Sequence, residues 1–186
     1  MVAAAMLSLP EQIAGRRIIL RRPTLDDTGS AFAWCSDPLV CRYLTWAPHR
    51  SLDDTRIYLD ECSRHWAAGS SCTYLLAEPH DPASPFGAID LRDLNSGVLF
   101  SFVLARTHWG HGYALEALKI AIIAAFAHPH VTRMWSFAHP DNAASCRVME
   151  KADLQFERIV PRFMVFPNLS AEPCDVRLYA MTRSAT

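Results

Sequence analysis

The stretch from residue 97 to 127 constrains the fold most, because it joins an apolar strand to an apolar helix through a glycine turn. Residues 97–105, GVLFSFVLA, are rich in β-branched, aromatic and aliphatic side chains, which is typical of a buried strand. Residues 112–127 are apolar apart from Glu116 and Lys119 and predict a core helix. A chain with this unit must build a sheet that the helix covers.

The connecting turn, THWGHG, permits four interpretations. A metal site is excluded, since no nearby Cys, Asp or Glu completes a coordination set with His108 and His111. A dinucleotide-binding loop is also excluded, because a third small residue is required where Leu115 stands and no acidic residue follows at the usual spacing. A plain turn into a core helix and a cradle for an anion both stay open.

The start of this helix favours the anion. The first turn of a helix leaves about four backbone N–H groups without partners, and no Ser, Asp or Asn stands where it could cap them. Gly110 and Gly112 carry no Cβ to obstruct a ligand, and the positive end of the helix dipole attracts negative charge. An anion at this site would most naturally be a diphosphate, and from the spacing alone a plain turn stays equally open.

The rest of the chain predicts one α+β domain over residues 1–186, with an ordered core from about 16 to 181. Two N-terminal helices are signalled by capping pairs, Thr24 with Asp27 and Ser51 with Asp54, and a short turn is expected between them at 36–44. Another turn is expected at 95–97, and a further helix at 142–152. Seven strands are predicted, at 16–23, 72–79, 86–94, 97–105, 132–140, 154–160 and 174–182.

Composition excludes several classes of partner. The net charge of −1 gives no basic surface for nucleic acid. Six scattered cysteines form neither a zinc-ribbon pattern nor a disulfide framework, so we predict reduced thiols and no metal. The apolar opening stops at Pro10, too short for a signal peptide or a membrane span. A cytoplasmic protein without a membrane partner is expected.

A second group of residues follows about thirty positions after the glycine turn. In HPDNAASCRVMEKADLQFE, Asp141 or Asn142 caps a helix that carries Ser145 in its first turn. The sequence WGHGYALEAL resembles the Q/R-x-x-G-x-G/A signature of the GNAT N-acetyltransferase superfamily, and NAASCRVMEKADL resembles its N-x-x-S-x-x-x-x-x-K-x-G-F helix. Over residues 16–181 the chain is similar to the RimJ/RimL-like branch, the ribosomal-protein N-terminal acetyltransferases.

This resemblance implies a fold and a cofactor site. The expected GNAT fold is a mixed, mostly antiparallel sheet of about seven strands with helices on both faces. Acetyl-CoA is expected in a V between the fourth and fifth strands, 97–105 and 132–140. Backbone groups of Phe102 and Leu104 would meet the pantetheine arm. The diphosphate would lie on the turn and helix start, formed by Thr107, His108, Trp109, Gly110, His111, Gly112, Tyr113 and Ala114.

The resemblance also implies catalytic roles. Asn142 matches the asparagine that binds the pantetheine arm, and Ser145 matches the general acid that protonates the leaving thiolate. The N–H of Leu104 would stabilise the oxyanion. The general base is unknown, because Val98 stands where many relatives carry a glutamate, and only Asp90 or a water on Ser101 is available to relay the proton.

Three positions depart from the family pattern. Thr107 replaces the Gln or Arg of the signature, Asp153 replaces a glycine, and Leu154 replaces a phenylalanine. The expected activity is direct acetyl transfer from acetyl-CoA to a primary amine, either a protein N-terminus or a small molecule, by a monomer or homodimer. The alternative is a CoA-binding regulatory or interaction module without turnover.

Overall fold

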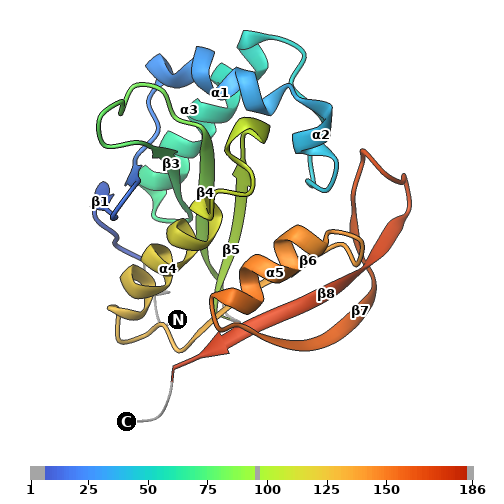
Figure 1. The fold of residues 1–186 in the computed structure, drawn as a ribbon. Coiled ribbons are helices and arrows are strands. Elements are labelled where there is room, and N and C mark those ends of the chain that lie inside the picture. The colour runs from blue at the N-terminus through green and yellow to red at the C-terminus, as the bar shows by residue number, and fades with distance from the viewer. Residues whose placement is uncertain (1–6, 95–96, 184–186) are drawn as a thin grey trace.

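The computed structural model describes residues 7–94 and 97–183 and places their strands in one sheet (Figure 1). Asn95 and Ser96, which belong to the turn predicted at 95–97, lie outside the described residues. The strand order in the sheet is β1-β2-β3-β4-β5-β6-β8-β7. The strands are β1 (Gln12–Ala14), β2 (Ile19–Arg21), β3 (Cys72–Ala77), β4 (Gly87–Leu94), β5 (Gly97–Leu104), β6 (Arg133–Ala138), β7 (Gln155–Val165) and β8 (Pro173–Thr182).

The helices are α1 (Thr28–Cys35), α2 (Pro38–Cys41), α3 (Leu52–Ala68), α4 (Tyr113–Phe126) and α5 (Ala143–Lys151), with 3-10 turns η1 (Leu25–Asp27) and η2 (Arg106–His108). The helices α1, α3, α4 and α5 lie where the sequence predicted them, and α2 is additional. Both predicted capping boxes are present, although the first one opens η1, which leads into α1.

Two short elements were not predicted, and β7 continues to Val165, beyond the end of the strand predicted at 154–160. The expected turn at 36–44 contains α2, which begins at Pro38 behind an Asp37 cap, because proline fits the first turn of a helix. The strand β1, which forms an antiparallel hairpin with β2, is the eighth strand and begins before the predicted core. Its three residues are too few to show a periodic pattern, so only tertiary pairing identifies it.

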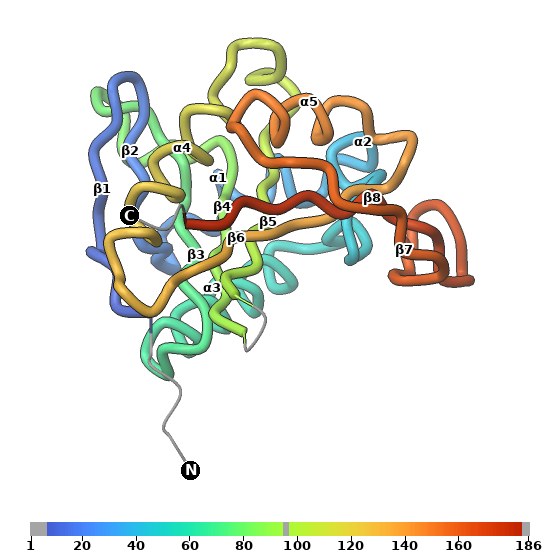
Figure 2. The backbone as a smooth tube through the Cα atoms, turned by 90° about the horizontal axis from the view of Figure 1, so that it is seen from below, coloured from blue at the N-terminus to red at the C-terminus, as the bar shows by residue number. Residues whose placement is uncertain are grey.

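Helices cover both faces of the sheet, as predicted. On one face, α4 and α5 bury Ala117 and Met149 against strand residues such as Phe100. On the opposite face, α1 and α3 bury Trp34 and Leu59. Seen from below, the β1–β2 hairpin and β7 lie at opposite ends of the sheet (Figure 2).

All neighbouring strands are antiparallel except β5 and β6, which α4 connects. This pair is therefore the parallel pair that the predicted V requires. None of the helices within residues 7–94 and 97–183 combines the length and apolar character that a membrane span needs.

Candidate active site

The strands β5 and β6 pair only where they begin. Their register joins Val98 to Met134 and Leu99 to Trp135, and the pairing ends there. Beyond this point the Ser136 hydroxyl donates a 2.7 Å hydrogen bond to the carbonyl of Phe100. The rest of β5, from Ser101 to Leu104, lies along an opening between the two strands, which we call the V.

The backbone of Phe102 and Leu104 points into the V. Successive residues of a strand direct their N–H and C=O groups to alternate sides. The N–H of Ala105 donates to Phe86 on the β4 side, at 2.7 Å, whereas the carbonyl of Phe100 faces β6. By alternation, the polar groups of Phe102 and Leu104 face β6 as well, which is the orientation that an added, strand-like ligand would need.

The turn before α4 leaves the helix start without a side-chain cap, as predicted. Gly112 is the N-cap residue and makes no side-chain cap bond, since it has no side chain. Gly110 and Gly112 both have left-handed φ angles, +80° and +79°, which glycine adopts at little cost. No atom lies within 4 Å of the Cβ that residue 110 would carry, so the loop is open on that side.

Part of the predicted phosphate loop is engaged in its own turn. The N–H of His108 donates to Ala105 and the N–H of Trp109 donates to Arg106, so these two groups are already bonded. Of the backbone N–H groups predicted to bind the diphosphate, those of His108 and Trp109 are thus already engaged, and the binding role of the loop stays a prediction. The Thr107 hydroxyl is 2.9 Å from Nδ1 of His108, so these two polar groups are hydrogen-bonded to each other.

A ring stack holds the side chain of His108, and a hydrogen bond holds that of Trp109. The His108 ring stacks on Phe86 with centroids 4.1 Å apart, and burial there lowers the pKa of His108. The Trp109 indole donates a 2.9 Å hydrogen bond to the carbonyl of Leu104. The indole thus engages the carbonyl of Leu104 at the end of the V and leaves the Leu104 N–H for a ligand.

The sequence analysis missed an arginine that holds this loop. Arg17 donates from Nη1 to the His111 carbonyl at 2.9 Å and from Nε to Glu116 at 2.7 Å. Its guanidinium also lies over the Tyr113 ring, 4.9 Å from the centroid. Partial burial would raise the pKa of the Glu116 carboxyl, but the bonds from Arg17 outweigh this and lower it. Arg17 stands about a hundred positions before its partners, so no local motif connects them.

At the other side of the V, Asn142 and Ser145 meet at the start of α5. The structure selects Asn142 over Asp141 as the N-cap, because its side-chain oxygen accepts the N–H of Ser145 at 3.2 Å. Both residues line one cavity with Leu99–Val103 and with Ser136. Sequence reasoning brought these segments together correctly.

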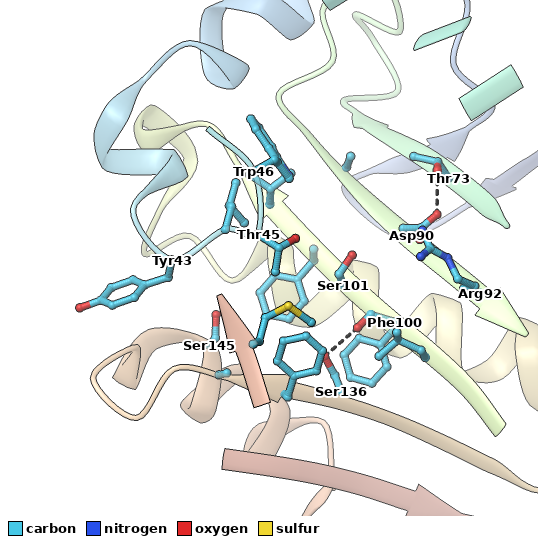
Figure 3. Close-up of a pocket in the computed structure, with 18 of the residues that line it drawn as sticks. Tyr43, Thr45, Trp46, Thr73, Asp90, Arg92, Phe100, Ser101, Ser136 and Ser145 are labelled. Atoms are coloured by element: carbon cyan, nitrogen blue, oxygen red, sulfur yellow. Dashed lines mark hydrogen bonds and ion pairs between the residues drawn. The ribbon is translucent and has the colours of Figure 1, made fainter. Parts of the chain in front are cut away.

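The cavity has a volume of about 410 Å³ and extends from the V to a second wall on its other side (Figure 3). That wall comes from the loop after α2, from α3, and from β3 and β4. In the view of Figure 3, Ser101 lies between Ser145 and Asp90. The cavity therefore has two sides, one at the V and one at Asp90.

Asp90 is held by neighbouring strands. Its Oδ1 accepts hydrogen bonds from the hydroxyl groups of Ser71 and Thr73, the latter at 2.7 Å, and Oδ2 lies 3.4 Å from Arg92. Ser101 is its cross-strand partner in β5, on the same face. A carboxylate has about four acceptor positions, so a further hydrogen bond to a ligand is available at Oδ2.

Aromatic side chains form the wall above Asp90. Trp46 and Tyr58 stack with centroids 6.5 Å apart, and His49 packs against both rings from behind. Burial lowers the pKa of His49, which keeps this imidazole uncharged near neutral pH. The wall presents neutral aromatic surface next to a carboxylate.

The side-chain amide of Asn168 holds the segment that carries Trp46. Asn168, in the loop between β7 and β8, donates from Nδ2 to the carbonyl oxygens of Cys41 and Trp46, at 2.6 and 2.8 Å. The segment that carries Trp46 is thereby tied to the C-terminal hairpin. No sequence signal indicated this contact.

The sequence profile described as Acetyltransferase (GNAT) domain matches residues 17–155, well over half of the chain. The chain belongs to the GNAT acetyltransferase family. The predicted family, the predicted fold and the predicted acetyl-CoA-dependent acyltransferase class are therefore confirmed at the level of the family. A curated relative, described as the uncharacterized N-acetyltransferase p20 of Bacillus licheniformis, is 22% identical over 152 residues, which cover 81% of this chain and 85% of the relative.

Solved structures share the fold at low sequence identity. A GNAT acetyltransferase from Bacillus anthracis is similar with a TM-score of 0.80 and 20% identity, covering 92% of this chain and 98% of that one. RimL, the ribosomal L7/L12 alpha-N-protein acetyltransferase, solved with coenzyme A, is similar with a TM-score of 0.79 and 18% identity, covering 95% and 100%. The microcin C7 self-immunity acetyltransferase MccE, solved with acetyl-CoA and AMP, has a TM-score of 0.82 and 13% identity, covering 96% and 99%.

Proposed function

We propose that this protein transfers the acetyl group of acetyl-CoA to a primary amine by direct attack in a ternary complex. The observation that carries the proposal is the V, whose inner edge is the backbone of Phe102 and Leu104 and whose mouth holds the uncapped start of α4. A strand-like pantetheine arm suits the first feature, and a diphosphate suits the second. RimL and MccE, which share this fold, were solved with CoA and acetyl-CoA.

In this proposal the V residues perform the acyl transfer. The amine attacks the thioester carbonyl, and the Leu104 N–H stabilises the negative charge that develops on the carbonyl oxygen. Ser145, half-buried at the cavity wall, donates its proton to the departing CoA thiolate and takes up the proton that the attacking nitrogen loses as the amide forms. Asn142 orients Ser145 by capping the helix that carries it, and its amide N–H groups are available to the pantetheine arm. Most of the acceleration comes from holding both substrates in line.

The acceptor enters from the side of Asp90. Its ammonium group binds the open acceptor position on Asp90, and its carbon body packs against Trp46 and Tyr58. The ammonium must lose a proton before attack, and ordered water beside Ser101 carries that proton away from the V. The proposal covers protein N-termini and small amines alike. RimL is described as acting on a protein N-terminus, and a structural neighbour from Vibrio cholerae is described as a spermidine N-acetyltransferase.

The test is to incubate the protein with acetyl-CoA and a mixed library of N-terminal peptides, polyamines and aminoglycosides. Acetylated products are identified by mass and free thiol release is followed in parallel. We expect one amine class to be acetylated with stoichiometric release of CoA. Binding of CoA without turnover of any amine would instead favour the regulatory module.

Two substitutions test the assigned roles. Ser145→Ala should lower kcat by about 100-fold or more while changing the KM for acetyl-CoA only slightly, since general acid catalysis contributes about this much. Ser30→Ala, on α1, is the matched control and should retain activity. Asp90→Asn should raise the KM for the amine at least tenfold and leave CoA binding unchanged. An unchanged kcat in Ser145→Ala removes its assignment as the acid.

A further inference from the structure

Arg17 lies beside the proposed diphosphate site, and neither the glycine turn nor the family signature accounts for its position. We infer that its guanidinium binds the diphosphate of CoA directly, as the cation that the signature lacks at Thr107. This inference rests on the proposed function and adds to it a binding residue from the N-terminal hairpin.

The hairpin brings Arg17 to the loop through a close backbone approach. Gly15 and Ile18 close the turn between β1 and β2 with a 2.8 Å hydrogen bond. A Cβ on Gly15 would lie 2.5 Å from Cδ1 of Ile120 and 2.9 Å from the Ile18 carbonyl, so only glycine allows the turn to pack against α4. The packing sets Arg17 beside the first turn of that helix.

The guanidinium is oriented on three of its sides. Nε is bonded to Glu116, Nη1 is bonded to the His111 carbonyl, and the plane lies over the Tyr113 ring. Nη2 faces the loop, because a Cβ on Gly112 would lie 3.6 Å from it. Within residues 7–94 and 97–183, no hydrogen bond engages Nη2. The side chain is 40% exposed, so a ligand can reach it.

A free Nη2 at this position suits a diphosphate. Nη2 lies 3.6 Å from the Cβ that Gly112, the N-cap of α4, would carry, so its two N–H groups are beside the start of the helix. Charge-assisted bonds from arginine to phosphate are among the strongest in proteins. An arginine fixed by other contacts also loses little side-chain entropy when it binds.

The negative charge of Glu116 near the helix start gives Arg17 a second role in binding a diphosphate. Glu116 lies in the first turn of α4, where its negative charge would repel a diphosphate. Arg17 bonds both oxygens of this carboxylate, through its backbone N–H at 2.8 Å and through Nε. At Thr107, where the signature carries Gln or Arg, the short hydroxyl is paired with His108 instead. Arg106, in the adjoining 3-10 turn, lies 3.3 Å from the carboxylate of Asp37, so Arg17 is the cation that contacts the loop at Gly112.

The experiment compares cofactors with and without the diphosphate. CoA binding to the full-length protein is measured by calorimetry, and kcat/KM is measured with acetyl-CoA and with acetyl-pantetheine. Arg17→Gln should weaken CoA binding by about 10- to 100-fold, the usual effect of one charge-assisted hydrogen-bonded group, and leave kcat/KM for acetyl-pantetheine within about twofold. Arg17→Lys should fall between, because it keeps the charge and loses the planar fork.

Salt dependence separates contact from loop support. Arg17→Gln should reduce the loss of CoA affinity with increasing salt, since one ionic contact is removed. Arg64→Gln, which removes an exposed cation paired with Asp60 on α3, is the control and should change none of these values.

Two results would overturn the inference. One is wild-type CoA affinity in Arg17→Gln. The other is an equal loss with acetyl-CoA and acetyl-pantetheine, which would mean that Arg17 only supports the loop. If Arg17→Gln does not fold, Arg17→Lys is used in its place. Full CoA affinity and an unchanged salt dependence in Arg17→Lys, which lacks the planar guanidinium, would contradict direct binding. Failure of the wild-type protein to bind CoA would instead refute the proposed function.

Discussion

Gly112 offers a quantitative test of the proposed anion cradle, the glycine turn and uncapped start of α4. Replacing it should change the free energy of unfolding and the affinity for CoA, and these two effects can be measured separately. The φ of Gly112 is +79°, and an L-residue in the left-handed region costs about 1–2 kcal/mol. The added Cβ would meet a single atom within 4 Å, Nη2 of Arg17, at 3.6 Å, which is an ordinary contact. We therefore expect Gly112→Ala to fold and to lose about 1–2 kcal/mol of stability.

The effect on the cofactor is larger than this strain alone would produce. The new methyl group would be on the N-cap residue, 3.6 Å from Nη2 of Arg17, so we expect it to obstruct an anion that approaches both Arg17 and the backbone N–H groups. Loss of one charge-assisted hydrogen bond costs about 1.5–3 kcal/mol, which corresponds to roughly 10- to 100-fold in affinity. Gly112→Val should abolish binding, because a β-branched residue adds both strain and bulk.

The assay pairs denaturant unfolding with calorimetric titration of CoA. Gly69→Ala is the matched control, since Gly69 ends α3 with a φ of +64° and lies outside the loop. It should lose similar stability and retain CoA affinity. Wild-type affinity in Gly112→Ala, together with the expected loss of stability, would refute the cradle.

Three further predictions concern stability. Gly29→Ala should stabilise the protein by about 0.5–1 kcal/mol in denaturant unfolding, because the position is exposed in α1 and a Cβ there meets nothing within 4 Å; destabilisation would contradict this. Asp153→Gly should raise stability by about 0.5 kcal/mol, since Asp153 has a φ of +67° after α5, and a loss would show that its side chain contributes there. Burial would raise the pKa of Asp27, but bonds from Arg21 and Thr24 lower it below 3.8, so its contribution is complete above about pH 5 and is lost as the pH falls through the lower, folded-state pKa. The stability difference between the wild type and Asp27→Asn should therefore shrink below about pH 5, and a constant difference would count against the ion pair.

Local signals in the sequence determined most elements correctly, because they act within a few residues. The capping pairs of Thr24 and Ser51 each start a helix or helical turn, since the bonds involved span three positions. The absence of a cap before Tyr113 was readable for the same reason. Where the signals were short, as in β1 and α2, the prediction failed, because three or four residues carry no periodicity.

The resemblance of the glycine turn and of the Asn142 helix to the family signatures also predicted which segments form the two sides of the V. What surrounds these segments could be known only from the folded chain. Arg17 reaches His111 and Asn168 reaches Trp46 across about a hundred positions, and Asp90 becomes a fixed acceptor only when β3 supplies its hydroxyl donors. Such contacts depend on the close approach of distant backbones, which packing decides and which no local sequence pattern records.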